Sequence, residues 1–180
     1  VYLHAAKIDN ARKYMDECLE LRKLLQITGG DEEPLAMLQA HVAGAEGKPQ
    51  YVISLLEPLT IRDKVNSAVL GLLGTAYSQT GQTSKAVETL TAYFKMKPRD
   101  GTQGDGGPIR ILLARQYGIQ GDWKSALQEA RRAEDAQKDN LAAGLFRIEA
   151  EMHVATGAAS GERAKAFSTL GDELAKLRVE

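Results

Sequence analysis

The sequence has little cysteine, few aromatic residues and almost no net charge. Cys18 is the only cysteine in 180 residues, so no internal disulfide can form and a disulfide scaffold is excluded. Aromatic residues make up 6% of the chain, and 23 Lys and Arg residues stand against 24 Asp and Glu residues. A nucleic-acid-binding protein needs excess positive charge to displace counterions from phosphates, so this balance argues against that class.

Long apolar runs are also absent. No run approaches the roughly 20 residues that a membrane-spanning helix requires. The chain is instead rich in Ala, Leu, Gly, Gln and Lys and poor in β-branched residues, a composition that indicates a helical repeat. We therefore expect an α-helical protein that is long enough to bury a sizeable core.

Apolar residues at helical spacing predict two helices between Ser67 and Pro98. The first stripe consists of Leu70, Leu73 and Tyr77. The second stripe consists of Ala86, Leu90 and Tyr93. Gly81 separates the two helices, and Pro98 ends the second because it has no backbone N–H to donate. Gly74 is small, which lets the two helices approach closely where their axes cross.

The same pattern recurs three more times. One copy lies upstream of residue 67, and two lie downstream of residue 107. The glycines expected in the turns are Gly47, Gly81, Gly121 and Gly157, separated by 34, 40 and 36 residues. An unrelated helical bundle would not explain why these glycines recur in phase with small residues.

These residues resemble the tetratricopeptide repeat (TPR), whose pattern includes L-G-x2-Y, then A-x3-F, then P. Leu73-Gly74-x2-Tyr77, Ala86-x3-Leu90 and Pro98 carry the resemblance. It implies an all-α fold, a right-handed α-solenoid of helix-turn-helix units. The expected divisions are a partial unit over 1–30, a TPR-like unit over 34–64, a TPR unit over 65–100, a Gly-rich loop over 101–107, a TPR unit over 108–139 and a degenerate unit with C-terminal helices over 141–180.

The first thirty residues resemble the second helix of a preceding unit, with its first helix cut to Val1–Ala6. Asp9 is then expected to cap that second helix, and Cys18 to be buried on its inward side. The chain is accordingly expected to be a fragment of a longer solenoid. Its cut end would expose apolar surface and associate with another copy.

A finer resemblance concerns the segments ARKYMDECLEL, SLLEPL, LLGTAYSQTGQTSKAVETL and ARQYGIQGDWKSALQEARRA. They are similar to the bacterial TPR lipoproteins linked to exopolysaccharide export and PEP-CTERM/exosortase surface sorting. That resemblance implies a periplasmic location, or membrane anchoring on the periplasmic side, in preference to the cytoplasm.

The three histidines do not indicate a metal site. His4, His41 and His153 have no Cys, His or carboxylate at metal-ligand spacing. His153 stands where other units carry Tyr77 and Tyr117, so we expect it to be a half-buried packing residue rather than a ligand or a base.

Two further features resemble chemical sites. The stretch Gly101–Gly107 lacks both the preceding strand and the following Lys-Ser/Thr of a phosphate-binding loop, and Pro108 suits the start of the next helix. Cys18 has no histidine close in sequence to activate its thiol. We therefore expect no catalytic residue, no metal and no cofactor.

Function in a TPR fold would lie in the groove lined by the first helix of each unit. The residues expected to bind a partner there are His41, Thr75, Ser78, Gln79, Arg115, Arg147 and Glu151. The Lys and Asn set with which some TPR domains hold a chaperone's C-terminal carboxylate is absent. Arg115 and Arg147 remain suited to an acidic group, because a guanidinium binds a carboxylate bidentately. Alternatively, Arg147 pairs with Glu151, one turn further along the same helix.

The sequence thus predicts a non-catalytic interaction scaffold that binds a peptide or protein partner in its concave groove, within a bacterial export, exopolysaccharide or surface-sorting assembly. Nucleic acid is not expected as a partner. A second hypothesis is an accessory or regulatory domain of a larger enzyme or sensor. A third is end-to-end self-association, and no acid/base pair or nucleophile constellation favours an enzyme.

Overall fold

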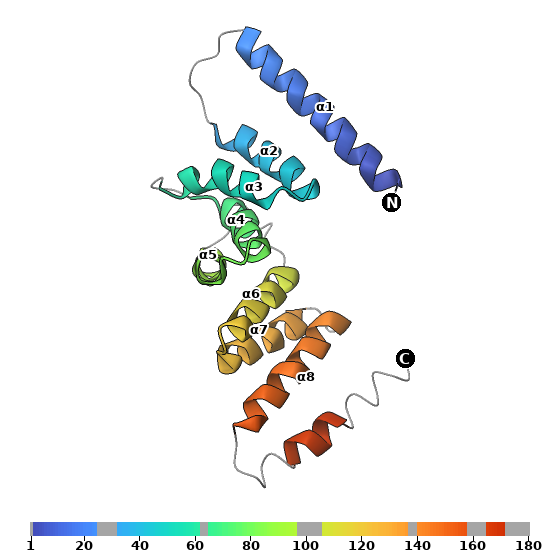
Figure 1. Ribbon diagram of the computed structural model, residues 1–180, viewed down its shortest axis with the longest axis vertical. Helices are drawn as coiled ribbons and strands as arrows, with labels where there is room; N and C mark the ends of the chain where they lie inside the picture. Colours follow the sequence, from blue (N-terminus) through green and yellow to red (C-terminus); the bar gives the residue numbers. More distant parts are fainter. Residues whose placement is uncertain are drawn as a thin grey trace. The chain divides into compact units, whose positions relative to one another are not determined.

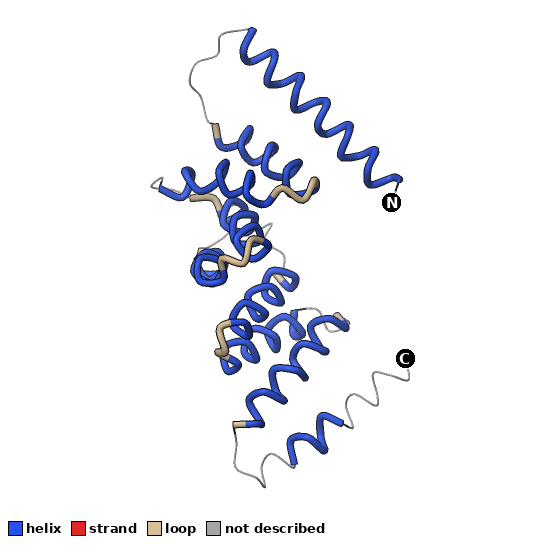
Figure 2. Tube along the Cα trace, in the orientation of Figure 1, coloured by secondary structure: helices blue, strands red, loops and turns tan. Residues whose placement is uncertain are grey.

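The computed structural model describes residues 2–24, 32–61, 65–96, 106–136, 140–157 and 165–171, and all regular elements in these ranges are helical (Figures 1 and 2). The helices are α1 (Tyr2–Leu24), α2 (Glu33–Ala45), α3 (Pro49–Leu56), the 3-10 helix η1 (Glu57–Ile61), α4 (Ser67–Gln79), α5 (Thr83–Lys95), α6 (Gly107–Ile119), α7 (Trp123–Ala136), α8 (Leu141–Thr156) and a short helix over 165–171. The chain divides into two compact units, Val1–Met96 and Lys97–Glu180.

In the first unit, α2 packs on α3, α3 on α4 and α4 on α5, so that successive helices form antiparallel pairs (Figure 1). The six residues of the two stripes expected between positions 67 and 98 are all buried. Asn66 starts α4, because its side-chain oxygen accepts a hydrogen bond from the Ala68 backbone N–H at 3.0 Å. Helix α5 ends at Lys95, and Pro98 lies outside the described residues.

The close approach of α4 and α5 depends on Gly74. A Cβ atom added there would lie 2.5 Å from Cδ2 and 2.7 Å from Cγ of Leu90, which is fully buried. Such distances are far inside van der Waals contact, so only glycine fits opposite Leu90 as it stands. The expected small residue at the helix crossing is confirmed.

Three of the expected turn glycines adopt backbone conformations that other residues rarely take. Gly47, Gly81 and Gly121 have φ values of 70°, 73° and 80°. A side chain at positive φ costs free energy, which explains why glycine recurs in these turns. Gly157 differs, because its φ is −82°, an ordinary right-handed value, so that position does not require glycine.

The core of the second unit is built largely from alanine. Ala114, Ala126, Ala130 and Ala150 are fully buried and pack with Phe146 between α6, α7 and α8. Small side chains let the helix axes approach, as Gly74 does in the first unit. Pro108 lies in the first turn of α6, as expected, and Gly107 is already helical. Residues 101–105 of the expected Gly-rich loop lie outside the described ranges.

Two expectations for the N-terminal segment were wrong. Helix α1 runs without interruption from Tyr2 to Leu24, so Asp9 lies in its interior and caps nothing. Cys18 is exposed rather than buried. Residues Ala11, Met15 and Leu19 are more protected than Cys18, because the face of α1 that they share is the partly buried one. Of the expected stripe of Ala11, Met15 and Cys18, the first two lie on this face, and Leu19 takes the place of Cys18.

Candidate functional site

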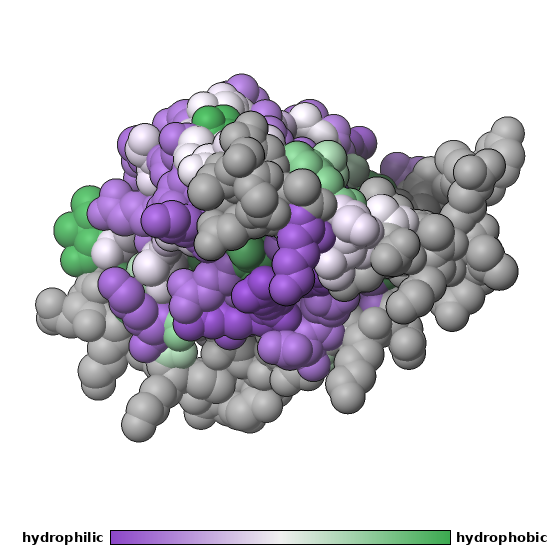
Figure 3. Space-filling view, turned by 90° about the horizontal axis from the view of Figure 1, so that it is seen from below, coloured by the Kyte–Doolittle hydropathy of each residue, from purple (hydrophilic) through white to green (hydrophobic). Residues whose placement is uncertain are grey.

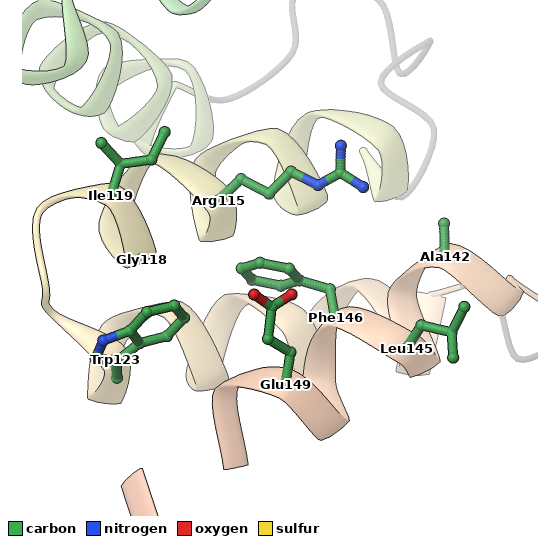
Figure 4. A pocket seen from close by; sticks show the side chains of 8 residues that line it. All are labelled: Arg115, Gly118, Ile119, Trp123, Ala142, Leu145, Phe146 and Glu149. Carbon is green, nitrogen blue, oxygen red and sulfur yellow. The ribbon is translucent and has the colours of Figure 1, made fainter. Parts of the chain in front are cut away.

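A pocket of about 600 Å³ lies between α6, the start of α7 and α8, all within the second unit (Figure 4). We call it the α6–α8 pocket. It is lined by Arg115, Gly118, Ile119, Trp123, Ala142, Leu145, Phe146 and Glu149. Two of its walls are the first helices of successive helix pairs, which is where the sequence places a partner-binding groove.

The pocket surface is mainly apolar. Ile119 is 68% exposed and Leu145 is 44% exposed, although both are large hydrophobic residues. Phe146 lies deeper, at 8% exposure, and belongs to the alanine-rich core. Figure 4 shows Ile119 on the α6 side and Leu145 on the α8 side of the same opening. Exposed apolar side chains that line one concavity mark a binding surface more often than a random part of the exterior.

Gly118 makes room for the aromatic floor. A Cβ atom at this position would lie 3.0 and 3.2 Å from two ring carbons of Trp123 and 3.6 Å from Cζ of Phe146. The missing side chain therefore lets both rings lie against α6. A larger residue here would push Trp123 away and change the shape of the pocket.

Two charged residues of opposite sign complete the lining. The guanidinium carbon of Arg115 lies 6.0 Å from the centroid of the Phe146 ring, at the outer limit of a cation–π contact. Glu149 is exposed on α8, and Figure 4 shows its carboxylate directed toward the pocket. Within the described ranges, neither residue is in an ion pair. Both charges border the pocket.

Trp123 is held in place from two sides. Asp122 caps α7, because its carboxylate accepts a hydrogen bond from the Ser125 backbone N–H at 3.1 Å, and hydrogen bonds from Ser125 lower the pKa of Asp122. The ring of His153 stacks on the indole at 3.6 Å between centroids and at an angle of 6°. The expectation that His153 is a packing residue is thus confirmed, but it is exposed rather than half-buried.

Arg147 and Glu151 lie elsewhere, in an ion-pair network on the side of α8 that faces α7. Arg147 bonds Glu134 and Glu151, each at 2.8 Å, and Arg131 bonds Glu151 at 2.9 Å. The alternative expectation for Arg147, a pair with Glu151, is therefore what the structure contains. Glu151 also lines a separate pocket of about 470 Å³ beside residues 165–170.

The other four predicted site residues belong to the first unit. His41 on α2 and Gln79 on α4 are exposed, and Ser78 is half-buried. The Thr75 hydroxyl donates a hydrogen bond to the Gly71 carbonyl oxygen at 2.8 Å, one turn earlier in α4. Of the seven predicted residues, the structure places only Arg115 in the α6–α8 pocket.

Among the pocket residues that sequence reasoning missed are Trp123, Leu145, Phe146 and Glu149. The interpretation of α8 assumed the same register as α6, which directed Arg147 and Glu151 into the groove. The apolar pair Leu145 and Phe146 was the available signal. Adjacent residues of a helix point in different directions, and here Phe146 is buried while Leu145 is 44% exposed.

A polar cluster in the first unit ties η1 to the hairpin of α4 and α5. The Tyr77 hydroxyl donates to Glu57 at 2.8 Å, and the Lys85 ammonium bonds the same carboxylate oxygen at 2.9 Å. Lys85 and Tyr77 together lower the pKa of Glu57. Burial, followed by the bond to Glu57, raises the pKa of Tyr77 to about 12.

The described part of the chain contains no group of three His, Cys, Asp or Glu side chains that could hold a metal ion. None of its helices combines the length and hydropathy needed to cross a bilayer. In the view of Figure 3, hydrophilic residues cover most of the coloured surface and hydrophobic ones form small groups.

Comparison with known proteins defines the class of fold. The tetratricopeptide repeat family matches residues 67–100, the hairpin of α4 and α5. A crystal structure of MamA has a TM-score of 0.67 at 15% sequence identity and covers 96% of this chain and 97% of its own. A structure of MamA AMB-1 has a TM-score of 0.66 at 17% identity, over 98% of this chain and 91% of its own.

A third solved structure contains TPR-like repeats of a Podospora anserina protein named as a kinesin light chain. Its TM-score is 0.54 at 18% identity, over 98% of this chain and 96% of its own. No curated protein matches the sequence significantly. At these identities the likeness establishes the fold. The predicted fold class, an all-α solenoid of TPR-like helix pairs, is confirmed, and one of these pairs, residues 67–100, matches the tetratricopeptide repeat model.

Proposed function

We propose that this protein is a non-catalytic scaffold that binds a peptide or protein partner in the groove formed by the first helices of its repeats, at the α6–α8 pocket. The observation that carries the proposal is the exposure of Ile119 and Leu145 around an aromatic floor. Burying apolar area of this kind on a partner supplies favourable free energy without any chemical step. The near-neutral net charge of −1 supports a protein rather than a nucleic acid as the partner.

Site-specific photo-crosslinking tests the proposal. A photoreactive amino acid replaces Ile119 in the pocket, and in a control protein it replaces Gln128, an exposed residue of α7 that does not line the pocket. We expect discrete partner adducts from position 119 that are absent from position 128. They should disappear when Leu145→Ser is added. Identical adducts from both positions, or none from either, would argue against the groove.

The cellular setting is a further part of the proposal. We place the scaffold in a bacterial export, exopolysaccharide or surface-sorting assembly on the periplasmic side of the membrane. The support is the resemblance of four segments, among them SLLEPL and ARQYGIQGDWKSALQEARRA, to TPR lipoproteins of such systems. Fractionation of the natural host by osmotic shock tests this, because recovery of the protein with cytoplasmic markers would contradict it.

End-to-end self-association is proposed as a second kind of contact. It is supported by Tyr14, Leu21 and Leu24 of α1, which are large apolar residues and are mostly exposed. Light scattering at increasing concentration should show a rising mass, and Tyr14→Ser with Leu21→Ser should abolish the rise. A strict monomer at high concentration would refute this contact.

A further inference from the structure

We infer that the α6–α8 pocket selects a peptide segment in which a bulky apolar side chain is flanked by one acidic and one basic residue. This inference rests on the proposed function and specifies the partner's chemistry. The apolar side chain lies on the aromatic floor, the partner's carboxylate pairs with Arg115, and its ammonium or guanidinium pairs with Glu149.

The apolar position follows from the shape of the pocket. Its volume of about 600 Å³ is open between Ile119 on one side and Leu145 on the other, with Trp123 and Phe146 below. Gly118 keeps this floor free of an aliphatic side chain from α6. A leucine-sized or aromatic anchor would therefore bury its own surface together with the exposed side chains of Ile119 and Leu145.

Arg115 provides the subsite for an acidic group. Its guanidinium carbon lies 6.0 Å from the centroid of the Phe146 ring, and Figure 4 shows the side chain on the α6 side of the pocket. The contrast with Arg147 supports this assignment. Arg147 is bound on both sides by carboxylates of its own chain, whereas Arg115 has no carboxylate partner in the described ranges. Arg115 is exposed, and a guanidinium can bind a carboxylate through two parallel hydrogen bonds.

Glu149 provides the subsite for a basic group. Its neighbour on the same helix, Glu151, is saturated by Arg131 and Arg147, while Glu149 is exposed and directed to the pocket. The rings of Trp123 and Phe146 line the same pocket and attract a cation. The pocket thus has one positive and one negative subsite. A ligand with two like charges would place one of them beside a subsite of the same sign, which disfavours its binding.

Synthetic peptides test the charge rule directly. In an extended chain, residues two apart lie on one face, so the probes carry their charges two residues from a central leucine. The mixed probes are Glu-Ser-Leu-Ser-Lys and its reverse, and the others replace both charged residues by Glu, by Lys or by Gln. Binding is measured by anisotropy of labelled peptide, and emission of Trp123, the only tryptophan, reports occupancy of this pocket.

We expect the tighter mixed peptide to bind about fivefold better than either like-charged peptide, a ratio typical of exposed ion pairs. Arg115→Glu should shift the preference to the Lys-Ser-Leu-Ser-Lys peptide, and Glu149→Lys to the Glu-Ser-Leu-Ser-Glu peptide. Lys95→Glu and Glu88→Lys on α5 are the matched controls, since both residues are exposed and the net charge changes equally. These controls should keep the preference of the unmodified protein.

The outcomes separate this inference from the proposed function. If all leucine peptides bind equally and change Trp123 emission, the groove stands and the charge rule is overturned. The charge rule is also overturned if the control variants shift the peptide preference as much as the pocket variants do. If no peptide binds and no adduct forms at position 119, the proposed function fails as well.

Discussion

Gly74 and Leu90 form a complementary pair whose counterpart in the next repeat is Ala114 and Ala130. In the first pair a glycine faces a leucine, and the leucine is in contact with the space where a Cβ would lie. In the second pair both residues are alanines, which are fully buried in one cluster. The two hairpins thus solve the same crossing with different residues, one with a glycine opposite a large side chain and the other with two small side chains.

This pairing predicts that Gly74→Ala lowers the free energy of unfolding of the unmodified protein but raises that of a Leu90→Ala protein. In the unmodified protein, the new methyl group overlaps Leu90, and we expect a loss of about 1–2 kcal/mol in the free energy of unfolding. In a Leu90→Ala protein the overlap is gone, and the same change should stabilise by about 1 kcal/mol through helix propensity. Urea unfolding of the four proteins measures both effects. Equal effects in the two backgrounds would disprove the contact.

Tyr77 predicts a distinct pH dependence. Its pKa is raised from 10.0 to about 12, so the folded state favours the neutral phenol. The resulting stability is fully present below pH 10 and is lost as the pH rises from 10 to about 12. Between pH 9 and 11.5, the unmodified protein should therefore lose stability more steeply than Tyr77→Phe. Chemical unfolding at several pH values tests this, and parallel curves would contradict it.

At the scale of elements, the start of α7 controls the position of the pocket's tryptophan. Asp122 caps the helix and precedes Trp123, while His153 of α8 stacks on the same indole. A cap bonded to N–H groups of the first turn fixes where the helix begins. The geometry of the pocket therefore depends on a residue that does not line it.

Asp122→Ala is expected to lower the free energy of unfolding by about 1 kcal/mol. Asp122→Asn should retain most of the stability, because an amide oxygen can also accept the hydrogen bond that caps the helix. The lowered pKa of Asp122 means that the charged cap stabilises above the carboxyl's ordinary pKa of 3.8 and loses this effect as the pH falls below it. Thermal melts at pH 7 and pH 3 measure both points. An alanine variant as stable as the unmodified protein at pH 7 would exclude the cap.

At the scale of the whole molecule, the chain consists of two compact units, and its only tryptophan lies in the second. In repeat proteins each unit contacts mainly its neighbours, so a local loss of stability remains partly local. Trp123 emission then reports the second unit, while far-UV circular dichroism reports helices of both.

Leu56→Ala, in the core of the first unit, should cost about 2–5 kcal/mol and move the circular dichroism transition in urea to lower concentration. The Trp123 transition should move much less. The matched variant Ile148→Ala, in the core of the second unit, should move the Trp123 transition directly. If Leu56→Ala shifts both probes equally, the two units unfold as one.

The helix pairs could be predicted because their signals are local. Apolar spacing placed Leu73, Tyr77 and Leu90 in the core, and three turn glycines were required by positive φ. The binding residues were predicted less well, and of the seven only Arg115 lines the pocket. The difference arises because a groove depends on how each helix is rotated against its neighbours, which the degenerate pattern of α8 does not specify.

By itself, the sequence determined that the chain is helical, where most helices begin and end, and which small residues lie at the crossings. These features depend on hydrogen bonds and steric limits within a few residues of one another. Only the tertiary structure decided that Arg147 is tied to Glu134 and Glu151, whereas Arg115 and Glu149 face an open pocket. That choice depends on contacts between α6, α7 and α8, where the charges of neighbouring helices either neutralise one another or remain available to a partner.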